Sequence, residues 1–130
     1  MAGFIDSNVL LFLITTEKAK ADKAMELLAD GGVVSVEVLD EIVQAARESG
    51  IDWHRASDFA DVVATLGKVQ PMTLETHKAA RTLGAADNLS MRDALMLASA
   101  LEAGCATIHS AVIPPGPKAG GRLMVIDPFA

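Results

Sequence analysis

The apolar residues of this chain follow two alternating patterns, short continuous runs and longer stripes with helical spacing. Short runs bounded by glycine, proline or polar residues are typical of buried strands, whereas apolar positions three or four residues apart indicate one face of a helix. The short runs predict strands at residues 4–5, 33–36, 69–72, 107–110 and 123–126. The stripes predict helices at residues 8–15, 19–29, 38–48, 53–66, 74–86 and 91–103.

Strands that alternate with single helices or pairs of helices predict an α/β fold. We expect a central parallel sheet of four to five strands, joined by right-handed crossovers and covered by helices on both faces. Residues 113–121 are rich in proline and glycine and predict a loop. No repeat or linker divides the 130 residues, so we expect one domain over residues 1–130.

Polar residues at the boundaries support these helices. Asp52 and Thr73 precede helical stripes and are expected N-caps, because their side-chain oxygens accept hydrogen bonds from the first turn. Asn88 suits the left-handed conformation that closes a helix. Ser90 and Asp93 form a capping-like pair at the start of the next helix.

The net charge of −6 limits the classes of partner. Proteins that bind nucleic acid non-specifically are usually strongly basic, so contact with nucleic acid here must be local or mediated by a metal ion. Cys105 is the only cysteine, which excludes an intrachain disulfide. No stretch approaches the roughly 20 apolar residues of a membrane span, and we expect a soluble cytoplasmic protein with no membrane contact.

Three acidic residues stand where chemistry is expected. Asp6 directly follows the first predicted strand, and in parallel α/β sheets ligands bind at the carboxyl ends of strands. Glu41 lies near the start of the helix after the second strand, and Asp93 at the start of the helix before the fourth. Each has a structural alternative: Asp6 caps the following helix, Glu41 is a solvated helix acid, and Asp93 belongs to a capping box.

If all three acids share one end of the sheet, their charges repel unless a cation neutralises them. Mg²⁺ or Mn²⁺ is the expected cation, because both prefer oxygen ligands. Removing one acid should relieve repulsion, so we expect no loss of stability from that change. A zinc site is not expected, because His54, His77 and His109 each lack a second histidine or cysteine at ligand spacing.

Three segments resemble PIN-domain ribonucleases, in particular the VapC-type toxins of toxin–antitoxin pairs. They are Phe-Ile-Asp-Ser-Asn at residues 4–8, Ser-Val-Glu-Val-Leu-Asp-Glu at 35–41, and Leu-Ser-Met-Arg-Asp-Ala-Leu at 89–95. The resemblance implies a three-layer α/β/α PIN-like domain. It also implies that Asp6, Glu41 and Asp93 are the metal-binding and catalytic residues. Supporting polar roles would fall to Ser7, Asn8 and Ser110.

The same resemblance implies an activity and partners. The activity would be hydrolysis of RNA phosphodiester bonds with Mg²⁺ or Mn²⁺, by an endoribonuclease. The partners would be an RNA substrate, a cognate antitoxin protein and a second copy of the chain in a homodimer. An antitoxin arginine would suit the carboxylates, because its planar fork matches them and competes with metal.

Two departures from the family pattern stand out. After the fourth strand the family commonly has Ser-Glu-Asp, whereas this chain has Ser110, Ala111 and Val112. The loss of these acids predicts weakened cleavage. The family's aromatic residue before the third acid is replaced by Arg92. Four basic residues could offset phosphate charge at the rim of the site, but we interpret them as ordinary surface rather than as site residues; they are Arg47, Arg92, Lys118 and Arg122.

Two alternatives belong to other functional classes. A catalytically degenerate PIN domain would keep the scaffold and act as an RNA-binding or protein-interaction module, which the missing acids favour. A receiver-like signalling domain would need paired acids after the first strand and a lysine after the last. Asp6 has no acidic neighbour and Lys118 lies in the predicted loop, so the receiver interpretation is disfavoured.

Overall fold

The protein is described by a computed structural model covering residues 2–130. Its six strands are β1 (Phe4–Ile5), β2 (Val33–Ser35), β3 (Lys68–Gln70), β4 (Thr107–His109), β5 (Gly116–Lys118) and β6 (Leu123–Ile126). Its α-helices are α1 (Ser7–Leu10), α2 (Lys18–Ala29), α3 (Val36–Glu48), α4 (Trp53–Leu66), α5 (Leu74–Asp87) and α6 (Met91–Glu102). Two 3₁₀ helices complete the chain, η1 (Leu11–Ile14) and η2 (Ala119–Gly121).

One sheet joins all six strands in the order β3-β2-β1-β4-β6-β5. The five predicted strands pair in parallel, as expected, and β5 pairs antiparallel with β6. The prediction of a loop at 113–121 is therefore wrong, because this segment contains β5 and η2. Pro117 lacks a backbone N–H, yet it is compatible with a strand here because β5 lies at the edge of the sheet.

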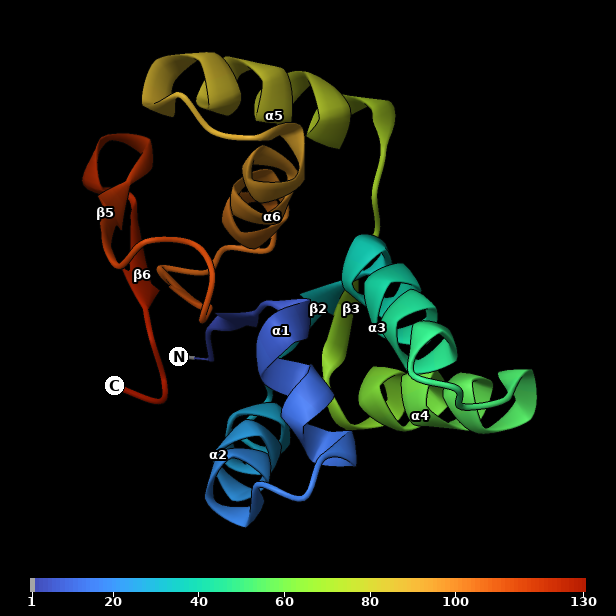
Figure 1. Ribbon diagram of the computed structural model, residues 1–130. Coiled ribbons are helices and arrows are strands. Elements are labelled where there is room, and N and C mark those ends of the chain that lie inside the picture. Colours follow the sequence, from blue (N-terminus) through green and yellow to red (C-terminus); the bar gives the residue numbers. More distant parts are fainter. Residues whose placement is uncertain (1) are drawn as a thin grey trace.

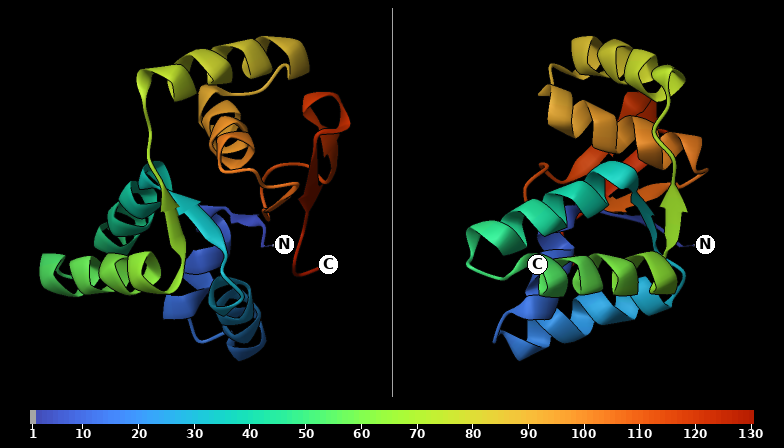
Figure 2. Two further views of the ribbon diagram at one scale, coloured as in Figure 1. Left: turned by 180° about the vertical axis from the view of Figure 1, so that it is seen from behind. Right: turned by 90° about the vertical axis from the view of Figure 1, so that its right-hand side faces the viewer.

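Helices cover both faces of the sheet and give the expected three layers (Figures 1 and 2). In Figure 1, α5 and α6 pack together on one side, while α1 to α4 gather on the other. The central strand β1 is fully buried between them, with Phe4 and Ile5 both inaccessible to solvent. Because β1, β2 and β4 are parallel neighbours, their carboxyl ends meet at one edge of the sheet.

The helix boundaries confirm most of the predicted caps. Asp52, Thr73 and Ser90 cap α4, α5 and α6, and Asn88 closes α5 with a φ of 52°. Two starts differ from the prediction. The first helix, α1, begins at Ser7 rather than at residue 8 and is capped by Asp6, and α3 begins at Val36 rather than at residue 38 and is capped by Ser35. Among residues 2–130 no helix is long and apolar enough to cross a membrane.

Candidate functional site

Asp6 lies at the carboxyl end of β1 and is completely buried. Its Oδ1 accepts a hydrogen bond from the backbone N–H of Ser7 at 2.7 Å, which caps α1, and its Oδ2 accepts one from the Ser110 hydroxyl at 2.8 Å. A buried carboxylate is costly unless its oxygens are hydrogen-bonded and its charge is compensated. Asp6 thus fulfils its structural alternative as a helix cap and is also a charged group fixed inside the protein.

Glu41 and Asp93 reach the same region from two different helices. Glu41 is on α3, the helix that follows β2, and its Oε1 accepts a 2.7 Å hydrogen bond from the Ser7 hydroxyl. Asp93 is in the first turn of α6, where its backbone N–H bonds to the cap residue Ser90. We call Asp6, Glu41 and Asp93 the acid cluster, since one cationic side chain contacts all three.

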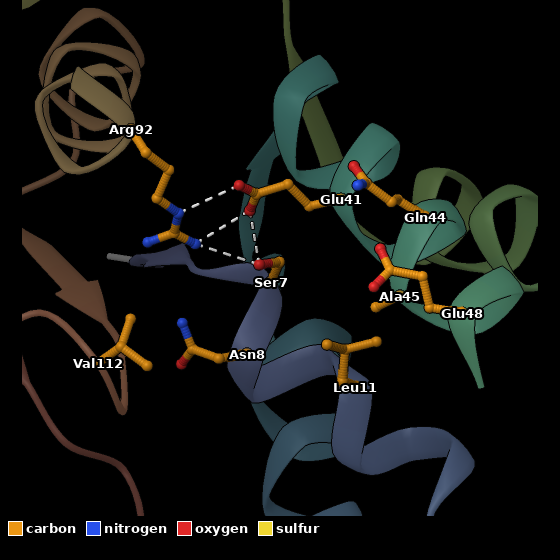
Figure 3. A pocket seen from close by; sticks show the side chains of 9 residues that line it. All are labelled: Ser7, Asn8, Leu11, Glu41, Gln44, Ala45, Glu48, Arg92 and Val112. Atoms are coloured by element: carbon orange, nitrogen blue, oxygen red, sulfur yellow. Dashed lines mark hydrogen bonds and ion pairs between the residues drawn. The ribbon is translucent and has the colours of Figure 1, made fainter. Parts of the chain in front are cut away.

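That cation is the guanidinium of Arg92, which Figure 3 shows beside Glu41 and Ser7. Its Nη1 donates to Asp6 Oδ2 at 2.9 Å, and its Nη2 makes a second, shorter contact with Asp6 Oδ1. Its Nε and Nη2 donate to the two oxygens of Glu41 at 3.1 and 3.0 Å, which Figure 3 shows. Its Nη1 also donates to Asp93 at 3.1 Å. All four carboxylate oxygens of Asp6 and Glu41 therefore accept a hydrogen bond from Arg92.

The interpretation of Arg92 as ordinary surface is wrong. Only 29% of its side chain is exposed, and it lies in the first turn of α6, where the helix dipole disfavours a cation. Burial lowers the pKa of the guanidinium, but hydrogen bonds to Asp6 and Glu41 outweigh this effect and raise the pKa above its ordinary value. The acids, not the helix, therefore hold Arg92 in this position.

The polar neighbours Ser110 and Asn8 fix the loop that follows β4. Ser110 is buried, and besides donating to Asp6 it accepts hydrogen bonds from the backbone N–H groups of Val112 and Ile113. Asn8 Oδ1 accepts a 2.7 Å bond from the backbone N–H of Ala111. Their side chains connect this loop to β1 and α1, at the edge where Asp6 lies.

An open pocket of about 360 Å³ borders the cluster. Figure 3 shows its lining residues, which are Ser7, Asn8, Leu11, Glu41, Gln44, Ala45, Glu48, Arg92 and Val112. Val112 is 60% exposed and lines this pocket. The position where the resemblance would place an aspartate thus faces the same pocket as Glu41 and Arg92, and carries a methyl-bearing side chain instead.

Glu37 is a residue of this region that the sequence did not reveal. It lies one helical turn before Glu41 on α3, and its Oε1 is buried without a hydrogen-bond partner among the described residues. Burial raises the pKa of its carboxyl to about 7, and the negative charges of Glu41, Asp6 and Asp40 add to this, against the opposing effect of Arg92. The spacing of four residues from Glu41 was the available signal.

Glu37 should make the stability of the folded protein depend on pH. Between pH 4.5 and about 7 the folded state binds more protons than the unfolded state, so this carboxyl lowers stability as the pH rises through that window. Glu37→Gln should raise the unfolding free energy at pH 8 by roughly 1 to 2 kcal/mol, allowing for partial solvent screening, and change it little at pH 4. Urea unfolding at both pH values measures this. The exposed Glu48→Gln is the control, and an equal gain there would contradict the assignment.

The donor chemistry of the acid cluster fits a hard divalent cation, because carboxylate oxygens are the ligands that Mg²⁺ and Mn²⁺ prefer. The arrangement around Arg92 leaves no position for one. Within residues 2–130, no three His, Cys, Asp or Glu side chains are placed so that they could hold a metal ion. A metal ion at the acid cluster therefore requires Arg92 to leave and the three carboxylates to move closer together.

Residues 3–111 match the model of the PIN domain. This chain belongs to the PIN domain family. No curated protein matches it significantly in sequence. The PIN fold explains why the acid cluster gathers at the edge formed by β1, β2 and β4, since parallel strands present their carboxyl ends together.

Several solved structures share the fold of this PIN domain. A toxin–antitoxin complex from Klebsiella pneumoniae aligns over 98% of both chains at 17% identity, with a TM-score of 0.69. VapC20 of Mycobacterium tuberculosis, a toxin that cleaves the sarcin–ricin loop, aligns over 81% of this chain and 85% of its own at 23% identity, with a TM-score of 0.63. VapBC2 of Rickettsia felis, bound to a promoter DNA fragment, covers 97% and 98% at 16% identity, with a TM-score of 0.68.

Proposed function

We propose that this PIN domain is an endoribonuclease of the VapC type, which hydrolyses RNA phosphodiester bonds with Mg²⁺ or Mn²⁺ bound by Asp6, Glu41 and Asp93. One observation carries the proposal: three acids from β1, α3 and α6 converge on a single cation at the edge of the sheet. A bound metal ion would activate a water molecule and offset negative charge on the phosphate.

The residues of the chain have separate tasks in this proposal. Asp6 is held rigidly by Ser7 and Ser110, so its carboxylate offers a fixed ligand. Glu41 is oriented by the Ser7 hydroxyl. Asn8 positions the loop after β4, which forms one wall of the pocket where RNA would lie. Ser7, Asn8 and Ser110 are therefore positioning residues in this proposal.

Asp6→Asn tests the proposal directly. The amide keeps the shape of the side chain but removes the charge that a divalent cation needs. Mn²⁺-dependent cleavage of a labelled RNA should fall at least about tenfold, which is about 1.4 kcal/mol of transition-state stabilisation, and calorimetry should detect weaker Mn²⁺ binding. Asp61→Asn, at an exposed position on α4, should match the parent chain in both measurements. If Asp6→Asn binds Mn²⁺ as tightly as the parent, the acid cluster is not the metal site.

A second candidate is a PIN domain that binds RNA or protein without cutting. The hydrogen bonds of Arg92 favour it, because they occupy the oxygens that a metal ion would need. The absence of a carboxylate at Ala111 and Val112 favours it as well. In the cleavage assay above, this candidate predicts RNA that stays intact with every metal ion while fluorescence anisotropy still detects binding.

We propose three partners for this chain. The substrate is RNA, bound in the pocket beside the acid cluster. A cognate antitoxin protein would cover that pocket, and the structural likeness to toxin–antitoxin complexes supports it. A second copy of the chain would form a two-fold homodimer. The expectation that an antitoxin arginine pairs with the acids needs revision, because Arg92 of the chain itself already does so.

A further inference from the structure

We propose that Arg92 is the resident cation of the acid cluster, and that its guanidinium and a divalent metal ion exclude each other. The PIN domain would then carry its own occupant of the site, which must leave before metal binds. This inference rests on the proposed function, because it takes the acid cluster to be the metal site. The inference goes beyond that function by naming the side chain that controls metal binding at the acid cluster.

Geometry makes the two cations exclusive. Arg92 nitrogens contact both oxygens of Asp6 and both oxygens of Glu41, and one further nitrogen contact reaches Asp93. A magnesium ion lies only about 2.1 Å from each of its oxygen ligands and requires near-octahedral space around it. An ion shared by these carboxylates would overlap the guanidinium that lies between them.

The charge of Arg92 also supports its role as the occupant of the acid cluster. Three carboxylates and one guanidinium leave two negative charges on the group, one fewer than the acids alone. The guanidinium has five N–H donors and contacts all four oxygens of Asp6 and Glu41, whereas an ammonium group has only three donors. Arg92 therefore supplies one of the two positive charges of a divalent ion and, like such an ion, bridges the carboxylates.

Arg92 also has room to leave. It lines the open pocket beside the cluster, and part of its side chain is exposed to solvent. If Arg92 exchanges between a position on the acid cluster and a position in the pocket, metal can bind only to the molecules in which the acids are free. The apparent metal affinity is then the intrinsic affinity multiplied by the fraction of those molecules. If Arg92 is displaced in one molecule in ten or fewer, the apparent affinity for metal is at least about tenfold below the intrinsic one.

Arg92→Gln tests this by calorimetric titration of the full chain with MnCl₂ after dialysis against a chelator. We expect the variant to bind Mn²⁺ at least about tenfold more tightly than the parent. Mn²⁺ should also raise its melting temperature more than it raises that of the parent, because the ion replaces the missing cation. Arg81→Gln, an exposed arginine on α5, is the matched control and should behave like the parent.

Arg92→Lys is the second variant, for the case that Arg92→Gln does not fold. Lysine keeps the positive charge but loses the fork, so its Mn²⁺ affinity should lie above that of the parent. Equal, measurable affinities in the parent and a folded Arg92 variant would overturn the inference and leave the proposed metal site standing. A folded Arg92 variant that binds no Mn²⁺ would reject the metal site itself, and the inference with it.

Discussion

Arg92→Gln and Val112→Asp, combined in one chain, should raise the rate of Mn²⁺-dependent RNA cleavage about a hundredfold over the parent. The first change frees the oxygens of Asp6 and Glu41, and the second adds a carboxylate at the exposed wall of the same pocket. A hundredfold gain corresponds to a barrier lowered by about 2.7 kcal/mol for the two changes together. Single-turnover cleavage of a labelled RNA, with the protein in saturating excess over the RNA, measures the rate.

The two changes should also reinforce each other, because they share one pocket. Val112→Asp alone should give less than tenfold, since Arg92 remains on the acid cluster. A control chain with Arg81→Gln and Val62→Asp makes the same chemical changes at exposed positions of α5 and α4 and should cut like the parent. A parent that already matches the double variant would contradict the expectation. A double variant that folds, binds Mn²⁺ and leaves RNA intact would favour the non-cutting module.

Asp6→Ala should destabilise the metal-free protein by about 3 to 5 kcal/mol, the range for breaking one partner of a buried ion pair. The change leaves the half-buried guanidinium of Arg92 without its closest carboxylate, and it removes the acceptor of the Ser110 hydroxyl. This replaces the expectation from the sequence that losing an acid relieves repulsion, because Arg92 already compensates part of that charge. Urea unfolding in the presence of EDTA measures the difference.

Arg92→Met should cost less stability in the Asp6→Ala background than in the parent, because the buried Asp6 carboxylate is then no longer there to be left unpaired, although Glu41 and Asp93 still lose their partner. A buried ion pair can often be replaced by apolar side chains at little cost, whereas removing one partner alone leaves an uncompensated charge. The double variant Asp6→Ala/Arg92→Met should therefore be more stable than the sum of the two single changes implies. A loss below about 1 kcal/mol for Asp6→Ala, or strictly additive effects, would show that the pair is not coupled.

Local signals in the sequence were sufficient for much of the fold. Apolar runs identified the five parallel strands, and capping chemistry identified Asp52, Thr73 and Ser90, because a cap depends on residues within one turn. The strand at Gly116–Lys118 was missed because its pairing with β6 is tertiary, while its proline and glycine locally favour a loop.

The candidate site was only partly predictable, for a related reason. The order of strands brings Asp6 and Glu41 to one edge, and Asp93 follows from its position before β4. The Arg92 side chain points toward the acids because β1 and α3 lie beside the first turn of α6. This is a tertiary arrangement, which the position of Arg92 along the helix does not reveal. The available signals were a cation at the wrong end of a helix dipole and its place directly before Asp93.

Anomalous diffraction from crystals of Arg92→Gln soaked in MnCl₂ tests the central claim most directly, because it locates the ion rather than measuring its effects. We expect an anomalous peak between the carboxylates of Asp6, Glu41 and Asp93, at the position that the guanidinium occupies in the parent chain. Crystals of the parent under the same conditions should show a weaker peak there, or none. A Mn²⁺ peak elsewhere on Arg92→Gln, with the acid cluster empty, would contradict the assignment of these acids as the metal site.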